Sequence, residues 1–331
     1  MYPQDGKEAM KAIRVNKNGG SDVLSVEELP TPQAADGQLL VKLAASGVNY
    51  IDTYQRSGLY KLPLPFTLGL EGAGVVEAVG KGVTAHKVGD RVAWTGVQGS
   101  YAEYVAVPAD RAVPVPEGMD TQQAAAIMLQ GLTAHYLCKD TYKVQKGDWV
   151  LIHAGAGGMG LLLTQMCKAL GATVITTVST EDKAGLSRGA GADHVILYTQ
   201  KDFEEEVNRI AGKNKLAVVY DAVGKTTFEK GLNLLRLRGM MVLYGQASGP
   251  VDPVDLGTLN AKGSLYVTRP GLFHYIATHE ELMMRANDVL GQVSRGELDV
   301  RIGKTFPLTE AKAAHDDLEG RRTTGKVLLI P

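Results

Sequence analysis

The stretch from Trp149 to Gly160, WVLIHAGAGGMG, decides the fold of this chain. An apolar run typical of a β-strand leads directly into the pattern G-x-G-x-x-G at residues 155–160. An amphipathic segment follows at residues 161–170, and a second apolar, β-branched run covers residues 173–178. This order of strand, glycine-rich turn, helix and strand predicts a unit that binds the pyrophosphate of a dinucleotide.

Each glycine of the pattern has an expected task. Gly155 is expected to permit the tight turn, Gly157 to let the backbone approach the phosphates, and Gly160 to let helix and strand pack closely. The helix that begins here would offer free N–H groups and the positive end of its dipole to the anion. The alternative is that the glycines serve only a close packing of strand against helix.

Composition narrows the class of protein. The chain has 331 residues, with 35 Lys and Arg against 36 Asp and Glu, so its charge nearly cancels. No basic run with interleaved aromatic residues is present, which gives no case for nucleic acid. No apolar run is long enough to span a membrane. The two cysteines, Cys138 and Cys167, form no C-x-x-C pair and are expected to be small buried residues in a protein of the reducing cytoplasm.

The pattern along the chain changes twice. The first 120 residues are short apolar runs broken by Gly and Pro, which predicts a β-rich domain. From residue 148 onward strands and helices alternate, which predicts a doubly wound parallel sheet. The expected strands are 150–153, 173–177, 194–197, 217–220, 240–244 and 264–268, and the clearest helices are 203–210, 227–235 and 280–295. The tail, from residue 300, is expected to be strand, helix and strand. Met10–Val15 is typical of a natural start, so residues 1–9 are expected to be either a disordered extension or the result of a miscalled start.

The residues after the second strand favour NADP over NAD. In this fold NAD enzymes place a carboxylate about 20 residues beyond the glycines, where it binds the ribose hydroxyls. Ser179 stands nineteen residues after Gly160, and Lys183 follows four residues later. A carboxylate would repel a 2′-phosphate, whereas a hydroxyl and an ammonium can bind one. The alternative is that Lys183 is an ordinary solvated helix residue.

Further motifs carry a resemblance to a known family. They are GVNYIDTY at residues 47–54, RSGLY at 56–60, YDAVG at 220–224 and GSLYVTRP at 263–270. With the glycine-rich loop they run nearly end to end, and the chain resembles the medium-chain dehydrogenases/reductases. Within that superfamily it is similar to the quinone oxidoreductases that include zeta-crystallin. The motif at 263–270 resembles that of the bacterial NADPH:quinone reductases.

The same resemblance argues against a metal. The zinc alcohol dehydrogenases of the superfamily hold their catalytic zinc with a Cys, a His in a Gly-His-Glu motif and a second Cys. At these places this chain has Asn49, Leu70 and Gln130, and the four-cysteine lobe has no counterpart. Zinc needs about four ligands, and Glu71 alone cannot supply them. We therefore expect no metal, and Glu71 is left open as a structural residue.

The resemblance implies an α/β fold of two domains with a cleft between them. A GroES-like, β-rich catalytic domain would comprise residues 1–130 and 298–331, and a Rossmann domain with a doubly wound parallel sheet would comprise residues 131–297. The implied catalytic residues are Asn49, Tyr54 and Tyr60. The implied NADP(H)-binding residues are Asn49, Tyr136, Gly155, Gly157, Gly158, Met159, Gly160, Ser179, Lys183, Tyr198, Ala222, Tyr244, Gly245, Gln246, Ala247, Val267, Thr268, Arg269 and Arg321. Alternatively, the tyrosines are packing aromatics, Asn49 is a turn former and Arg321 is a surface charge.

The implied activity is hydride transfer from NADPH to a quinone, without zinc. One alternative is an NADPH-dependent reductase of alkenals or enones on the same fold. Another is a zeta-crystallin-like RNA-binding or structural protein, against which the near-neutral charge argues. The implied assembly is a homodimer through the strand at 263–269, because a sheet edge with unpaired N–H and C=O groups needs covering. The physiological acceptor, one- or two-electron transfer, and the proton donor stay open.

Overall fold

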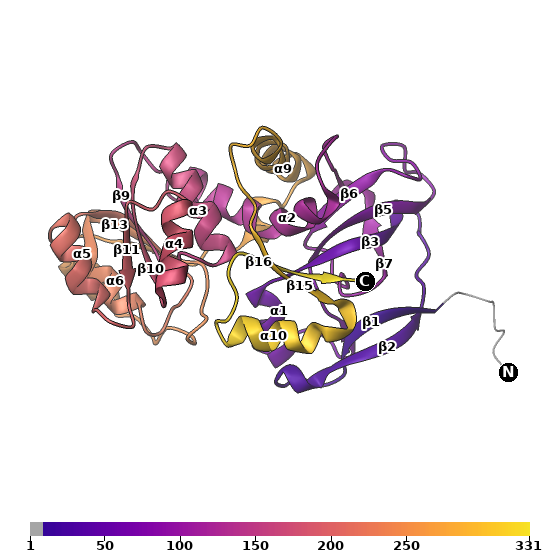
Figure 1. Ribbon diagram of the computed structural model, residues 1–331, viewed down its shortest axis with the longest axis horizontal. Coiled ribbons are helices and arrows are strands. Elements are labelled where there is room, and N and C mark those ends of the chain that lie inside the picture. The colour runs from indigo at the N-terminus through magenta and orange to yellow at the C-terminus, as the bar shows by residue number, and fades with distance from the viewer. Residues whose placement is uncertain (1–8) are drawn as a thin grey trace. The chain divides into compact units, whose positions relative to one another are not determined.

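The computed structural model describes residues 9–331 and divides into two compact units. The first unit comprises residues 9–129 and 278–331, and the second comprises Gln130–Ala277 (Figure 1). Residues 1–8, which the sequence interpretation treated together with Ala9, lie outside the described residues. Ala9 itself begins the first strand.

The second boundary differs from the sequence interpretation. The structure groups helix α9 (His279–Ser294) with the first unit, whereas the sequence placed residues up to 297 in the nucleotide-binding domain. One contact that joins this helix to the first unit is a hydrogen bond of 2.7 Å from Nδ1 of His279 to the carbonyl oxygen of Asp110. The first boundary falls inside helix α2 (Thr121–Tyr136), next to the predicted position.

The second unit contains the predicted parallel sheet. Its strands are β9 (Trp149–Ile152), β10 (Thr173–Val178), β11 (His194–Leu197), β12 (Leu216–Asp221), β13 (Leu235–Leu243) and β14 (Tyr266–Thr268). They pair in the order β11-β10-β9-β12-β13-β14, and every pair is parallel. The helices are α3 (Gly158–Ala169), α4 (Glu181–Gly189), α5 (Phe203–Ala211), α6 (Phe228–Leu234), α7 (Leu256–Ala261) and α8 (Leu272–Tyr275). Helices α3 and α4 cover one face of the sheet, and α5 and α6 cover the other (Figure 1).

Burial explains why these segments are strands. All six residues of β12 are buried, as expected for a central strand covered by helices on both faces. Two elements differ from the prediction. Strand β14 begins at Tyr266 because Gly263 and Ser264 have left-handed backbones, with φ of 114° and 55°. Helix α2 gives way at Leu137 to one wider π-helical turn, Leu137–Thr141, whereas the helical spacing of residues 122–142 predicts a continuous helix.

The first unit contains two sheets in which most neighbouring strands are antiparallel. The larger sheet has the order β15-β16-β3-β5-β6-β8, with β7 also pairing with β3, and the smaller has the order β2-β1-β4. Their strands are β1 (Ala9–Val15), β2 (Leu24–Pro30), β3 (Gln38–Val48), β4 (Phe66–Thr67), β5 (Glu71–Val79), β6 (Arg91–Thr95), β7 (Tyr104–Pro108), β8 (Val113–Pro114), β15 (Ile302–Pro307) and β16 (Lys326–Ile330). Among the described strands of this unit, only β15 and β16 are parallel to each other. The helices are α1 (Tyr50–Ser57) and α10 (Ala311–Glu319), with α9.

The tail completes this unit. The predicted strand, helix and strand are present as β15, α10 and β16, and β16 pairs with β3, so Val327 lies opposite Val48. Leu329 and Phe306 from the tail share a buried core with Ile13 from the start of the chain. The last strand therefore brings its first residue, Lys326, next to the end of β3.

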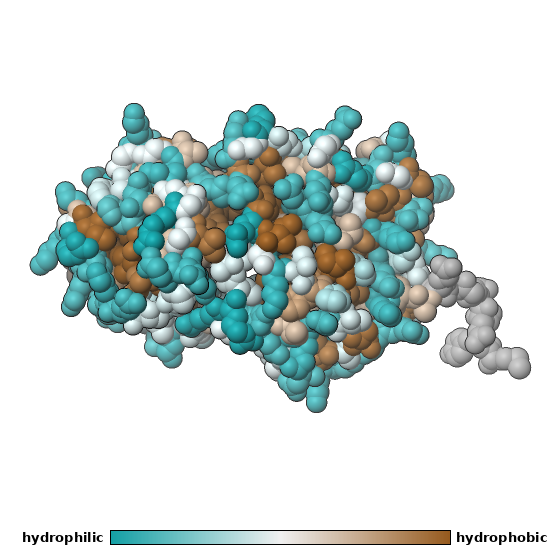
Figure 2. Space-filling view, in the orientation of Figure 1, coloured by the Kyte–Doolittle hydropathy of each residue, from teal (hydrophilic) through white to brown (hydrophobic). Residues whose placement is uncertain are grey.

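The surface shown in Figure 2 is mostly hydrophilic, with separate apolar patches. Within residues 9–331, the structure contains no helix with the length and apolar character needed to cross a membrane. Cys138 and Cys167 are buried and form no disulfide, as expected.

Candidate functional site

The glycine-rich loop leads into the start of helix α3. The N-cap residue, Gly157, provides no side-chain cap, and the first turn contains no acidic residue. The first N–H groups of a helix have no partner within the helix, so this end suits an anion. Gly160 has its predicted role, because a Cβ there would lie 2.3 Å from the carbonyl oxygen of Ala154.

The role predicted for Gly155 is wrong. The left-handed residue of the turn is Ala154, with φ of 57°, and Gly155 has no positive φ. A Cβ on Gly155 would instead lie 2.5 Å from Cβ of Thr176 in β10. Gly155 therefore lets the loop pack closely against the neighbouring strand.

Three of the predicted 2′-phosphate residues follow two adjacent strands. Ser179 and Lys183 come after β10, and Tyr198 comes after β11, where its backbone N–H donates to the carbonyl oxygen of Val178 at 3.1 Å. The backbone N–H of Lys183 donates to Oγ1 of the N-cap residue Thr180 at 3.3 Å. Tyr198 is 39% exposed, so its ring is accessible to a ligand. The carboxyl ends of parallel strands meet at one edge of the sheet, and ligands of this fold bind there.

The predicted residues 222, 244–247 and 267–269 lie at the same edge, in or directly after β12, β13 and β14. Gly245 lies against Ala222, since a Cβ on Gly245 would be 2.6 Å from the carbonyl oxygen of Ala222. Arg269 donates from Nη1 to the carbonyl oxygen of Leu243 at 3.1 Å. The hydroxyl of Tyr244 is buried without a hydrogen-bond partner, and this burial raises its pKa. Such a hydroxyl suits a polar ligand.

Two residues of the predicted cofactor set come from segments that do not follow these strands. Tyr136 belongs to the second unit, is buried, and stacks on Tyr275 with a centroid distance of 4.0 Å. Arg321 belongs to the first unit, where it follows α10 on an exposed left-handed backbone with φ of 57°. The glycine-rich loop and the residues after β10 to β14 fit a dinucleotide phosphate, whereas the role of Arg321 stays a prediction.

In the first unit, Asn49 belongs to a buried polar cluster. Its Nδ2 donates to Oε2 of Glu71 at 2.8 Å, and its Oδ1 accepts from Nζ of Lys326 at 2.7 Å. Lys326 also forms an ion pair with Glu71 at 2.5 Å, and both side chains are almost fully buried. The other carboxylate oxygen of Glu71 accepts from the backbone N–H of Leu129 at 2.6 Å.

A second series of buried hydrogen bonds runs from Asp52 to Arg56. Oδ2 of Asp52 accepts from the backbone N–H of Asn49 and from the Tyr101 hydroxyl, each at 2.8 Å. The Tyr101 oxygen lies 3.2 Å from Nε2 of His315, whose Nδ1 lies 2.9 Å from Nη1 of Arg56. Because a guanidinium only donates, Nδ1 accepts and the imidazole proton lies on Nε2.

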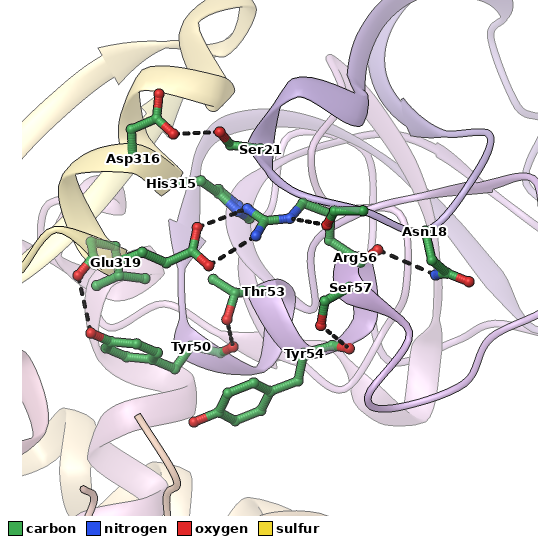
Figure 3. Close-up of polar contacts among 12 residues, drawn as sticks. Asn18, Ser21, Tyr50, Thr53, Tyr54, Arg56, Ser57, His315, Asp316 and Glu319 are labelled. Carbon is green, nitrogen blue, oxygen red and sulfur yellow. Dashed lines mark hydrogen bonds and ion pairs between the residues drawn. The ribbon is translucent and has the colours of Figure 1, made fainter. Parts of the chain in front are cut away.

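This series of hydrogen bonds ends near the surface, at an ion pair between Arg56 and Glu319. Arg56 donates two hydrogen bonds, of 3.0 and 2.9 Å, to the carboxylate of Glu319 in α10 (Figure 3). Burial raises the pKa of Asp52 to about 7, although its hydrogen bonds lower it. Burial, with the nearby charge of Arg56, lowers the pKa of His315 to about 3.

Tyr54 and Tyr60 lie together beside this cluster. Their ring centroids are 5.3 Å apart with an interplanar angle of 61°, and the backbone N–H of Tyr60 donates to the carbonyl oxygen of Tyr54 at 3.0 Å. Figure 3 shows the Tyr54 ring pointing away from Arg56. Tyr60 is 38% exposed. Both rings, with Asn49 at the start of α1, come from one segment of the first unit.

The residues at the expected zinc positions do not fit zinc. Leu70 is buried and apolar, and the Glu71 carboxylate already accepts from an amide, an ammonium and a backbone N–H. Gln130 belongs to the second unit, where its side chain lies against Gly158. Within residues 9–331, no three His, Cys, Asp or Glu side chains are grouped so that they could hold a metal ion.

Comparison with known proteins places the chain in a family. The family described as "Alcohol dehydrogenase GroES-like domain" matches residues 35–117, and "Zinc-binding dehydrogenase" matches residues 158–278. A quinone oxidoreductase of Pseudomonas aeruginosa is 46% identical over 323 residues, which are 97% of this chain and 99% of that protein. The chain belongs to the quinone oxidoreductase family of the medium-chain dehydrogenases/reductases.

Two further relatives bear on the ligand. The crystal structure of Escherichia coli quinone oxidoreductase complexed with NADPH has a TM-score of 0.95 and 44% identity, covering 97% of this chain and 100% of that one. A 2-haloacrylate reductase of Burkholderia is 43% identical over 329 residues, which are 97% of this chain and 98% of that protein. The predicted family and both fold types are therefore confirmed.

The name of one matching family refers to zinc, but we expect none in this protein. Elemental analysis of the purified protein should find far less than one zinc per chain, and a chelator should leave its activity unchanged. The reason is that Asn49, Leu70 and Glu71 offer no free set of ligands. About one zinc per chain, with activity lost to the chelator, would contradict this expectation.

Proposed function

We propose that the protein is an NADPH-dependent quinone reductase that requires no zinc. The observation that carries this proposal is the grouping of Ser179, Lys183 and Tyr198 at the sheet edge, with no carboxylate directly after β10. The 46% identity to a quinone oxidoreductase, and the NADPH bound in a structural relative, support the acceptor and the cofactor.

NADPH would supply a hydride, and the chain's own residues would bind and orient the reactants. The start of α3 would hold the pyrophosphate, while Ser179, Lys183 and Tyr198 would hold the 2′-phosphate. Asn49 and the hydroxyls of Tyr54 and Tyr60 would face the acceptor. Hydrogen bonds from the two tyrosine hydroxyls would stabilise the negative charge that develops on the acceptor oxygen. A quinone is electrophilic enough that its carbonyl needs no metal for polarisation.

The identity to a 2-haloacrylate reductase favours one alternative, an NADPH-dependent reductase of alkenals and other activated alkenes. The two functions share cofactor and fold and differ in the acceptor. Steady-state oxidation of NADPH against a panel of quinones, alkenals, enones and 2-haloacrylates separates them. We expect kcat/KM to be highest for a quinone, whereas a higher value for an activated alkene than for every quinone would establish the alternative.

We also propose that the protein acts as a cytoplasmic homodimer through strand β14. Among the described residues this strand pairs only with β13, and Tyr266 is 57% exposed. An exposed edge of this kind can pair with its twin in a second copy. The two cysteines, which form no disulfide, support a reducing compartment.

Light scattering at micromolar concentration should give twice the mass of the chain. Tyr266→Lys should shift this mass toward the monomer, because it places a charge at the proposed junction. Val26→Lys is a matched control, since Val26 is 46% exposed on a strand of the first unit. A monomeric wild-type protein would refute the proposal, as would an equal shift in both variants.

A further inference from the structure

Lys326 is a buried cation that the sequence interpretation did not use. It begins β16, while Asn49 directly follows β3 and Glu71 begins β5. These strands are neighbours in the order β16-β3-β5, so three residues distant in sequence meet at one end of the sheet. Their side chains are between 0% and 3% exposed.

The backbone leaves room for this pair. A Cβ on Gly47 would lie 2.1 Å from Oε2 of Glu71 and 2.8 Å from Cε of Lys326. Ser46 holds the strand that carries Glu71, because its hydroxyl donates to the Glu71 carbonyl oxygen at 2.9 Å. The ion pair therefore needs a glycine at residue 47, because even a methyl group there would collide with it.

The chemistry of the partners fixes how the Asn49 carboxamide is turned. An ammonium can only donate hydrogen bonds, so the atom of Asn49 that faces Lys326 must be the oxygen. An ionised carboxylate can only accept, so the atom that faces Glu71 must be the nitrogen. Both contacts select the same orientation, and reversing the amide would break both.

We propose that Lys326 is a positioning residue for the reduction, and that it acts by holding the Asn49 carboxamide in this single orientation. An ammonium thus contacts Asn49, the residue at one of the places where the zinc alcohol dehydrogenases have a zinc ligand. The inference rests on the proposed function, because it takes Asn49 as a residue that contacts the reactants. Lys326 itself contacts Asn49 and Glu71.

Two variants separate positioning from stability. Lys326→Met leaves the Glu71 carboxylate buried without its cation, and such a charge is strongly destabilising. Lys326→Met combined with Glu71→Gln removes both charges. The oxygen of Gln at 71 must then face the Leu129 N–H, which turns its NH₂ group toward Asn49. This contact should reverse the Asn49 carboxamide, at the cost of the longer hydrogen bond, of 3.3 Å, from Nδ2 of Asn49 to the carbonyl oxygen of Gly47.

The expected results follow from that reversal. The single variant should melt well below wild type, and the double variant should recover most of the difference. The kcat of the double variant should nevertheless stay about 10- to 100-fold below wild type, as expected when a group is misplaced by about 1 Å. Its Kd for NADPH should change by much less than this factor, because the 2′-phosphate residues are in the other unit. A crystal structure of the double variant should show hydrogen bonds consistent with the reversed amide.

A third substitution tests whether the effect passes through Asn49. Asn49→Ala alone should lower kcat, and adding it to the double variant should lower kcat little further. The control is Lys304→Met with Asp317→Asn, which removes an exposed ion pair of 2.5 Å in the same unit and should leave kcat unchanged.

The inference is overturned if the double variant recovers both melting temperature and kcat, or if the losses from Asn49→Ala and the double variant multiply. Absence of NADPH-dependent turnover in wild type would refute the proposed function instead. In that case the crystal structure of the double variant still decides the inference. A reversed carboxamide supports it, and an unchanged one overturns it.

Discussion

Ser179→Asp should raise the Kd for NADPH by about a hundredfold or more, because like charges brought together at a binding site cost several kcal/mol and each 1.4 kcal/mol is a factor of about ten. The new carboxylate would stand directly after β10, where NAD enzymes bind the ribose hydroxyls and where a 2′-phosphate would meet its negative charge. The Kd for NADH should stay the same or fall. Fluorescence titration of both cofactors measures the change.

Ser179→Asn is the matched control, because asparagine has nearly the shape of aspartate without its charge. Its effect on NADPH should be much smaller. Lys183→Ala should raise the Kd for NADPH by about ten- to hundredfold, the contribution of one charge-assisted hydrogen bond, and leave NADH nearly unchanged. A wild type that prefers NADH would remove the basis for the NADP assignment. An equal loss of both cofactors in Lys183→Ala would make this lysine a solvated surface residue.

Asp52→Asn should change how stability depends on pH. Burial raises the pKa of Asp52 to about 7 in the folded protein, against an ordinary value of 3.8. Between these values the folded state holds one more proton than the unfolded state, so this group makes the free energy of unfolding fall as pH rises. Asparagine removes that dependence. The difference in this free energy, variant minus wild type, should rise by up to about 1.4 kcal/mol per pH unit from about pH 4 to pH 7 and then level off.

His315 changes the free energy of unfolding with pH in the opposite direction, and it is present in both wild type and Asp52→Asn. Its pKa is lowered from 6.5 to about 3, so stability falls as pH drops and the unfolded state takes up a proton. In wild type the two dependences oppose each other in the acidic range, and Asp52→Asn should reveal that of His315. Urea unfolding at a series of pH values measures both.

Asp317→Asn is a control of reversed sign. Hydrogen bonds from Lys304 and then Arg322 lower the pKa of Asp317, so its contribution to stability is lost as pH falls below about 4. The difference between this variant and wild type should therefore fall as pH rises in that range. A flat difference for Asp52→Asn between pH 4 and pH 7 would show that Asp52 does not carry the raised pKa.

The parts of the fold that the sequence predicted are those with a local signal. The run into Gly155–Gly160 contains strand, turn and helix start in consecutive residues, and the alternation beyond it predicted all six parallel strands. Boundaries failed where backbone conformation depends on tertiary contacts. Ser264 takes a left-handed backbone that its residue type does not predict, and the turn before α3 uses Ala154 instead of Gly155.

The buried cluster could not be predicted because its members are distant in sequence. Lys326 is the first residue of an apolar strand, a position where a lysine is usually a solvated flanking charge, and its burial follows only from the pairing of β16 with β3. Arg56 and His315 likewise meet only because α1 and α10 pack together. By contrast, Asn49 and Tyr54 were found through a motif shared with a family, which indicates function without showing contacts.

The most direct test of the account is the turnover of the metal-free wild-type protein with a quinone, NADPH and NADH being compared at equal concentrations in the presence of a chelator. We expect rapid quinone reduction with NADPH and a kcat/KM at least about tenfold lower with NADH, as the loss of one charge-assisted hydrogen bond predicts. Activity that appears only when zinc is added, or that is as high with NADH as with NADPH, would contradict the account.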